Sequence, residues 1–126
     1  MSNERRKTQL TAVVDDDESV RNAVHGVLKS VGLKTRSFAS AEEFLVSGQQ
    51  SETACLIVDI RMPGMSGLDL QVKLAHEDCR IPIIFITSCG DTKIRTRAMN
   101  AGAVGFLNKP FDDEVLIESV RAALES

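Results

Sequence analysis

Ionisable and hydroxyl side chains follow four of the apolar runs in this chain of 126 residues. If the fold brings several carboxylates into one cleft, they repel one another unless a cation neutralises them. The usual arrangement for Mg²⁺ is one or two carboxylates, several waters and a substrate phosphate. The side chains in question are Asp15, Asp16 and Asp17 after the first run, Asp59 after the third, Thr87 after the fourth and Lys109 after the fifth.

These side chains supply what phosphoryl transfer to a carboxylate needs. A carboxylate can attack phosphorus and form an aspartyl phosphate. The transferred group then needs charge stabilisation on its equatorial oxygens, which Mg²⁺, the Lys109 ammonium and the Thr87 hydroxyl would provide from different sides. Asp59 directly follows Leu-Ile-Val, where a carboxylate is costly to bury unless it is paired or bound to a metal. The pattern therefore favours a phosphoacceptor site over a simple acidic turn.

Five short strands are expected to alternate with five helices. Three of the strands are nearly unbroken apolar runs, which is typical of parallel strands covered on both faces, whereas the second is polar and suits a sheet edge. The alternation predicts an α/β fold, (βα)5, with a doubly wound five-stranded parallel sheet and helices on both faces. Sites in such sheets form beyond the carboxyl ends of the strands. The expected strands are Leu10–Val14, Lys34–Phe38, Ala54–Val58, Ile83–Ile86 and Val104–Leu107.

The helical segments show amphipathic spacing and end signals. Gly32 is expected to cap the C-terminus of the first helix. Ser40 with Glu43 predicts a capping box for the second helix, and Asp112 predicts the N-cap of the last. The apolar positions are Val20, Val24, Val27, Leu28 and Val31 in the first helix, Leu68, Leu70, Val72 and Leu74 in the third, Ile94, Ala98 and Ala101 in the fourth, and Leu116, Ile117, Val120 and Leu124 in the fifth.

The composition excludes several classes of protein. The chain is 43% hydrophobic and 26% charged, which is globular rather than disordered, and its net charge of −3 is unsuited to binding nucleic acid phosphates. Its apolar stretches reach about five residues, far below the ~20 needed to cross a bilayer. We expect one domain over residues 1–126, with residues 1–8 as a disordered N-terminal tail and no membrane association.

The cysteines indicate the compartment. Cys55, Cys79 and Cys89 are an odd number at irregular spacing, without a C-x-x-C pair. We therefore expect reduced thiols and a cytoplasmic protein. Cys55 lies inside an apolar run and is interpreted as a core residue.

The motifs around the strand ends resemble the receiver domain of two-component response regulators. The resemblance extends from Leu10 to Leu124 and includes the subset whose receivers precede a helix-turn-helix output module. The chain stops at the fifth helix, so it is either a single-domain regulator or a receiver whose output module lies outside it. The family implies a flavodoxin-like strand order, 2-1-3-4-5. The motifs are Val-Val-Asp15-Asp16-Asp17-Glu18, Val-Asp59-Ile-Arg-Met-Pro63-Gly-Met-Ser-Gly67, Ile-Thr87-Ser and Asn-Lys109-Pro110-Phe111.

The resemblance also implies a metal site and a phosphoryl donor. Asp59 would accept the phosphoryl group from a phosphohistidine on a sensor histidine kinase. Asp16, Asp59 and the backbone carbonyl of Arg61 would ligate Mg²⁺ directly, and Asp15 would act through water.

Further roles follow from the same resemblance. Lys109 would pair with Asp59 and then with its phosphate, and Thr87 would bond a phosphoryl oxygen. Phe106 would be a rotating aromatic switch, although an aromatic residue in a strand is more simply a core residue. The Lys109–Pro110 bond would be cis. Arg61 and Cys89 stand two residues beyond the acceptor and the threonine, at positions that influence phosphate lifetime, so that lifetime stays open.

Two other functions use similar ingredients. An Mg²⁺-dependent phosphohydrolase with an aspartate nucleophile needs the same side chains. That enzyme class, however, has a second acid two residues after the nucleophile, where this chain has Arg61. Its nucleophile also precedes its acidic pair, whereas here Asp15 and Asp16 precede Asp59. An adaptor that uses the fold without being phosphorylated is the third reading, and the complete set of site residues argues against it.

Two surfaces are expected to meet partners. The first helix, around Arg21 and Asn22, is the family's usual docking face for the kinase. Opposite charges on the fourth and fifth helices could support a phosphorylation-linked homodimer, and two solvated helix faces explain them equally well. The charges are Lys93, Arg95 and Arg97 on the fourth helix and Asp112, Asp113, Glu114 and Glu118 on the fifth.

Overall fold

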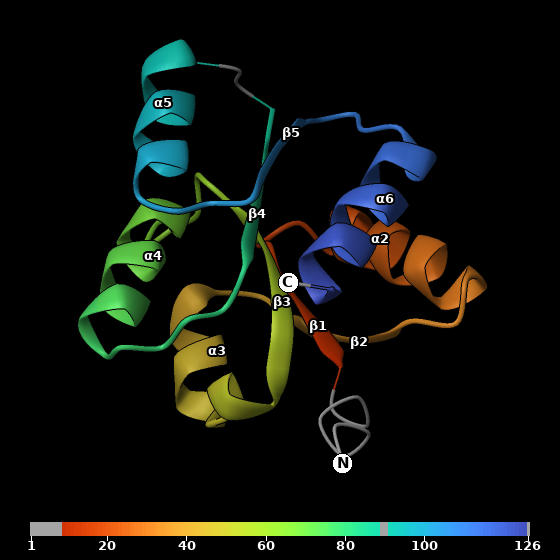
Figure 1. The fold of residues 1–126 in the computed structure, drawn as a ribbon, viewed down its shortest axis with the longest axis horizontal. Coiled ribbons are helices and arrows are strands. Elements are labelled where there is room, and N and C mark those ends of the chain that lie inside the picture. Colours follow the sequence, from red (N-terminus) through yellow and green to blue (C-terminus); the bar gives the residue numbers. More distant parts are fainter. Residues whose placement is uncertain (1–8, 89–90, 126) are drawn as a thin grey trace.

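The computed structural model describes residues 9–88 and 91–125, so the tail predicted over residues 1–8, as well as Cys89, lies outside the described residues. Five strands form one parallel sheet in the order β2-β1-β3-β4-β5 (Figure 1). This is the predicted doubly wound, flavodoxin-like arrangement. The strands are β1 (Leu10–Val14), β2 (Lys34–Phe38), β3 (Thr53–Asp59), β4 (Ile83–Thr87) and β5 (Gly105–Asn108).

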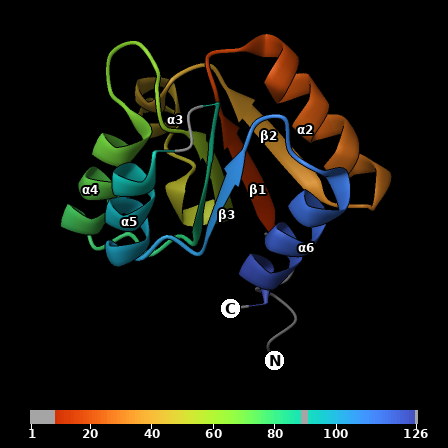
Figure 2. The ribbon, with the colours of Figure 1, turned by 90° about the horizontal axis from the view of Figure 1, so that it is seen from above.

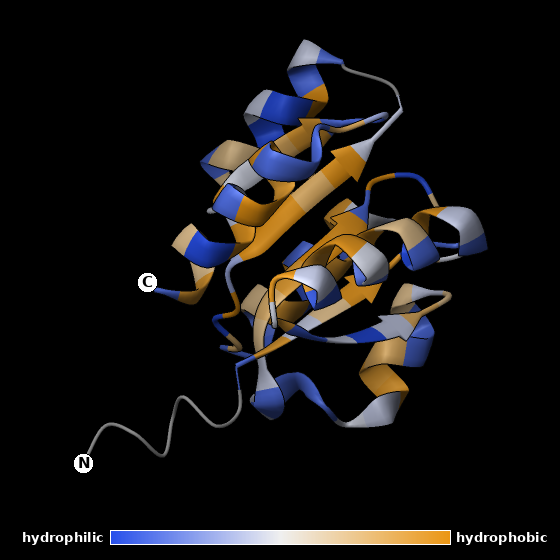
Figure 3. Cartoon of the chain, turned by 90° about the vertical axis from the view of Figure 1, so that its right-hand side faces the viewer, coloured by the Kyte–Doolittle hydropathy of each residue, from blue (hydrophilic) through white to orange (hydrophobic). Residues whose placement is uncertain are grey.

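Helices cover both faces of this sheet. α2 and α6 pack on one face, and α3, α4 and α5 pack on the other (Figure 2). The central strands are the most apolar part of the molecule (Figure 3), because both of their faces are covered. The helices are α2 (Glu18–Ser30), α3 (Ala41–Ser47), α4 (Gly67–His76), α5 (Thr92–Asn100) and α6 (Asp113–Leu124), with a short 3-10 helix, η1, at Gln50–Glu52.

Three strands differ from prediction at their ends. β3 and β4 each extend far enough to include a polar residue, Asp59 and Thr87, because both residues still pair with the neighbouring strand. β5 begins at Gly105 rather than Val104, which lies half-exposed before it. A Cβ on Gly105 would lie 3.3 Å from the Ile84 side chain, so glycine lets β5 approach β4 closely.

The helix ends largely follow the sequence signals. Asp112 accepts hydrogen bonds as the N-cap of α6, and Gly32 takes a φ of +82° just beyond α2. Ser40 accepts from Glu43 as expected, but the Glu43 carboxylate accepts from the Ala39 amide instead of the Ser40 amide. The reciprocal capping box is found at α4, between Ser66 and Asp69.

Two positions depart from their predicted stripes. Ala101 is exposed and follows α5 as its C-cap. Val72 of α4 is half-exposed, whereas Leu68, Leu70 and Leu74 are buried. None of the helices in the described parts of the chain combines the length and the apolar character that a bilayer-spanning helix needs.

Candidate functional site

The carboxyl ends of β1 and β3 bring two buried carboxylates to the same edge of the sheet. Asp15 directly follows β1 and is fully buried, and Asp59 is the last residue of β3 and is 6% exposed. The two strands are paired in parallel up to Val14 and Val58, so the residues that follow leave the sheet side by side. The side chains of Asp15 and Asp59 therefore meet because the register places them together.

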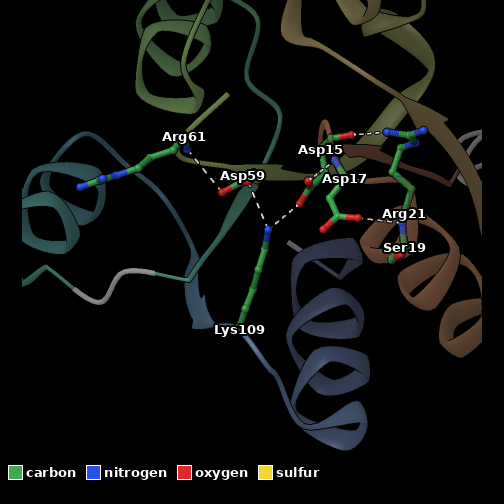
Figure 4. A network of polar contacts seen from close by, with 7 residues as sticks. All are labelled: Asp15, Asp17, Ser19, Arg21, Asp59, Arg61 and Lys109. Carbon is green, nitrogen blue, oxygen red and sulfur yellow. Dashed lines mark hydrogen bonds and ion pairs between the residues drawn. The ribbon is translucent and has the colours of Figure 1, made fainter. Parts of the chain in front are cut away.

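A lysine from the end of β5 lies between these two carboxylates. Lys109 Nζ is 3.2 Å from Asp59 Oδ2 and 3.0 Å from Asp15 Oδ2 (Figure 4). The Lys109 backbone is fixed by its amide, which donates to the Thr87 carbonyl at 2.7 Å. The bond from Lys109 to Pro110 is cis, as the family resemblance predicts. One ammonium thus serves two buried negative charges, and the pairing with Asp15 was not predicted from the sequence.

The loop after β1 holds Asp15 in place. Asp15 Oδ1 accepts a hydrogen bond from the Asp17 amide at 2.8 Å, and Asp17 in turn caps α2 through the Ser19 amide. Arg21 of α2 donates to the Asp15 carbonyl oxygen at 2.6 Å (Figure 4). This role of Arg21 was not predicted, because a side chain bonded to a backbone carbonyl leaves no pattern in the sequence.

Three carboxylates at this edge could hold a metal ion. Oxygens of Asp15, Asp16 and Asp59 all lie within 4.8 Å of one another, and Asp16 is the exposed member. Asp15 Oδ2 is buried, and among the described residues it has no well-aligned hydrogen-bond donor, although the Lys109 ammonium lies close to it. Oxygen donors with an uncompensated negative charge are what a hard divalent cation prefers. The residues therefore fit Mg²⁺.

The electrostatics of the site agree with this geometry. Burial raises the pKa of the Asp59 carboxyl, and the Asp15 charge raises it further, while Lys109 opposes both effects. Burial alone would lower the pKa of the Lys109 ammonium, but its close pairing with Asp15 and the charges of Asp15 and Asp59 raise it overall. In the absence of a metal, the site thus holds more negative charge than its single lysine neutralises.

The other predicted residues lie around this centre. Thr87 ends β4 and is buried. Phe106 of β5 lies opposite Phe85 in the strand register, with the ring centroids 6.5 Å apart. Arg95 of α5 stacks its guanidinium on the Phe106 ring at 5.8 Å. Phe106 is only partly buried at the edge of the core, so the structure places it between a core position and the surface.

Arg61 lies two residues beyond Asp59, in the loop that leads to α4. Its amide lies 3.4 Å from Asp59 Oδ1, a long hydrogen bond, and the residue is exposed. The general acid of an aspartate-nucleophile phosphohydrolase would stand at this position. An exposed arginine there cannot donate a proton to a leaving group at neutral pH.

Fold and site together define a class of protein: a doubly wound α/β domain with a carboxylate cluster and a lysine at the carboxyl edge of its sheet. The family model of the response regulator receiver domain matches residues 11–121. The chain belongs to this family. Receiver domains of response regulators are signalling switches of two-component signal transduction.

Several known proteins are similar to this chain. Nodulation protein W of Bradyrhizobium diazoefficiens is 50% identical over 113 residues, which cover 90% of this chain and 50% of that protein. Response regulator protein TmoT of Ectopseudomonas mendocina is 46% identical, over 90% of this chain and 51% of that protein. The crystal structure of FixJ-N superposes with a TM-score of 0.84 at 39% identity, over 93% of this chain and 94% of that one. The chain spans about half the length of the curated relatives it matches.

Proposed function

We propose that Asp59 is the phosphoacceptor of this receiver domain and takes its phosphoryl group from a phosphohistidine on a sensor histidine kinase. The observation that carries the proposal is the position of Lys109, whose ammonium lies within 3.2 Å of both Asp15 and Asp59. The Asp59 carboxylate at the end of β3 is buried and already has the Lys109 ammonium beside it. A nucleophile so placed needs only the phosphoryl group and further charge compensation.

In the proposed transfer, one phosphorus–nitrogen bond breaks and one phosphorus–oxygen bond forms. A carboxylate oxygen of Asp59 attacks phosphorus in line with the phosphorus–nitrogen bond. That bond breaks as the new phosphorus–oxygen bond forms, and the electron pair leaves with the imidazole nitrogen, which takes up a proton. Lys109 remains beside the acceptor oxygen and stabilises the added negative charge. Thr87, buried at the neighbouring strand end, supplies a hydroxyl to a phosphoryl oxygen.

The three carboxylates would hold the metal. Asp16, Asp59 and the backbone carbonyl of Arg61 are proposed as direct ligands, and Asp15 as a ligand through water. Bound Mg²⁺ would neutralise the carboxylates and the oxygens of the incoming group. The clustering of Asp15, Asp16 and Asp59 supports this assignment, as does the raised pKa of the Asp59 carboxyl, which reflects burial and the Asp15 charge.

Phosphorylation is proposed to change the packing around Phe106. A charge of about −2 on Asp59 would draw the Thr87 hydroxyl toward the phosphate, and the space left would favour an inward Phe106 ring. The loss of the stacked Arg95 from that ring would alter the surface formed by α5, β5 and α6. This is a shift between two packings, caused by contacts that only the phosphorylated state makes.

Partners are proposed for two surfaces. The kinase docks on α2 near Arg21 and Asn22. The oppositely charged faces of α5 and α6 pair in a phosphorylation-linked homodimer. Sedimentation with and without a phosphoryl mimic tests the dimer: an increase in mass is expected, and an unchanged mass would refute it.

Intact mass spectrometry with a small acyl phosphate tests the central proposal. In the presence of Mg²⁺ the chain is expected to gain the mass of one phosphoryl group, and chelation of the metal should abolish the gain. Asp59→Asn should abolish it as well. The matched control is Asp78→Asn, because Asp78 is an exposed acid after α4 and its positive φ is one that asparagine tolerates.

The same experiment separates the alternatives. Multiple turnover of phosphate monoesters would favour the phosphohydrolase. A folded chain that neither binds Mg²⁺ nor gains mass would favour the unphosphorylated adaptor.

A further inference from the structure

The loop between β3 and α4 carries the backbone next to the phosphoacceptor. A hydrogen bond from the Gly67 amide to the Ile60 carbonyl at 2.9 Å closes its base. Met62, which is buried, anchors its first half in the core. Its second half, residues 63–65, is more exposed, and there Gly64 turns the chain with a φ of +76°. Of these residues, Met65 packs its side chain against the core, whereas Pro63 and Gly64 are exposed, so the backbone of the outer half gains from a further support.

Glu42, in the first turn of α3, reaches this outer half. Its Oε2 accepts a hydrogen bond from the Met65 amide at 2.9 Å. A Cβ built on Gly64 would lie only 2.6 Å from the same oxygen, so the carboxylate occupies the space that a side chain at position 64 would fill. The Glu42 carboxylate therefore contacts the loop at two neighbouring positions, Gly64 and Met65, although Glu42 precedes them by more than 20 residues.

We propose that Glu42 is a positioning residue that holds the β3–α4 loop so that its backbone serves the Asp59 site. The inference rests on the function proposed above, in which the Arg61 carbonyl is a metal ligand. The Glu42 carboxylate oxygen gives the Met65 amide its acceptor, and outer partners that orient a ligand tune the affinity for the metal. Glu42 touches neither the metal nor the reacting atoms in this role.

The neighbouring residue offers a matched control. The Glu43 carboxylate accepts from the Ala39 amide at 2.8 Å and so remains at the N-terminus of its own helix. Glu43→Ala and Glu42→Ala remove the same group from adjacent positions of α3. Only Glu42→Ala removes a contact with the loop.

Hydrogen exchange tests the contact directly and without metal. In the metal-free protein, Glu42→Ala should speed the exchange of the Met65 amide by roughly tenfold or more, because its acceptor is lost. Glu42→Gln, which keeps an acceptor oxygen, and Glu43→Ala should leave that exchange rate near the wild-type value. Equal Met65 exchange in wild type and Glu42→Ala would overturn the proposal.

Calorimetric titration with Mg²⁺ tests the consequence for the site. Glu42→Ala should weaken binding by about tenfold, while Glu42→Gln and Glu43→Ala stay within about threefold of wild type. Gly64→Ala should also weaken binding, because its Cβ displaces the Glu42 carboxylate and because a φ of +76° strains any residue that has a side chain. Equal losses in Glu42→Gln and Glu42→Ala would assign the effect to charge alone and overturn the positioning role, and so would wild-type affinity in Glu42→Ala.

The two proposals fail in different ways. If the wild-type chain binds Mg²⁺ but gains no phosphoryl group, the phosphoacceptor function fails, while the exchange and titration results still decide the role of Glu42. If the wild type is phosphorylated and Glu42→Ala matches it in Met65 exchange and Mg²⁺ affinity, only the positioning role fails.

Discussion

Alanine at position 67 should damage both the fold and the site. Gly67 opens α4, and a Cβ there would lie 2.3 Å from the Asp59 carbonyl oxygen, 3.1 Å from the Asp59 carbonyl carbon and 3.2 Å from the Ile60 Cα. All three are backbone atoms that cannot move aside by a change of rotamer. The loop would have to move away from β3 by most of an ångström and stretch the Gly67–Ile60 hydrogen bond.

The magnitude follows from these contacts. Overpacking costs about 1–3 kcal/mol, and a strained backbone hydrogen bond adds about 1 kcal/mol. We expect Gly67→Ala to lower the free energy of unfolding by about 2–4 kcal/mol, against a typical total of about 5–15 kcal/mol, so the variant still folds. Because the colliding oxygen belongs to Asp59, phosphorylation by an acyl phosphate should slow as well.

Gly26 provides the opposite result from the same substitution. It lies inside α2, and a Cβ there would meet nothing within 4 Å, so Gly26→Ala should stabilise the chain by about 1 kcal/mol through helix propensity. Urea unfolding followed by far-ultraviolet circular dichroism suits both variants, since the chain has neither Trp nor Tyr. If Gly67→Ala is as stable as wild type, the close approach of α4 to the end of β3 is wrong.

Three further predictions concern charge and capping. Asp59→Asn should raise the stability of the metal-free chain at pH 7, because it removes one of two carboxylate charges that lie within 4.8 Å of each other. Two like charges at that distance repel by roughly 3.5 kcal/mol at a dielectric of about 20, and the lost pairing with Lys109 offsets part of this. Burial and the Asp15 charge raise the pKa of Asp59, so the folded state keeps the proton to higher pH than the unfolded state, and the stability of the wild type falls as the pH rises above the ordinary pKa of 3.8. Urea midpoints of both chains at pH 4 and 7 check both statements, and a variant less stable than wild type at pH 7 would contradict them. Burial raises the pKa of Cys55 from 9.0 to about 12, so the unfolded chain loses this proton first and stability falls above about pH 9 by up to about 1.4 kcal/mol per pH unit. The stability of Cys55→Ala should fall less steeply with pH, and equal slopes in the two chains would show that Cys55 is not the cause. Asp112 accepts hydrogen bonds from two amides at the start of α6, so in urea unfolding Asp112→Ala should lower the free energy of unfolding by about 1 kcal/mol and Asp113→Ala by much less. A larger loss for Asp113→Ala would contradict the capping role of Asp112.

The fold was readable from the sequence because burial leaves a strong pattern. Strands covered on both faces need continuous apolar runs, and the helices between them need one apolar stripe. The strand ends were less accurate, because Asp59 and Thr87 look like loop residues by polarity and yet pair with their neighbours. Hydrogen bonding between strands does not depend on side-chain type, so polarity alone places a strand end too early.

The gathering of acids and lysine at one sheet edge was also predictable, whereas their pairing was not. Strand order and register determine that Lys109 reaches Asp15 as well as Asp59, and neither can be read from residue types alone. The contacts of Arg21 with the Asp15 carbonyl and of Glu42 with the Met65 amide have backbone atoms as partners. Such contacts depend on how loops are placed in space.

Locating the phosphoryl group on the chain tests the central claim most directly. After incubation with Mg²⁺ and an acyl phosphate, borohydride reduction converts an aspartyl phosphate to homoserine, and peptide mapping then identifies its position. We predict homoserine at position 59 alone, because Asp59 pairs with the Lys109 ammonium and is 6% exposed at the end of β3, whereas Asp15, the other partner of Lys109, is fully buried. Homoserine at another acid, or none in a folded chain that has bound Mg²⁺, would contradict a phosphoacceptor site built around Asp59.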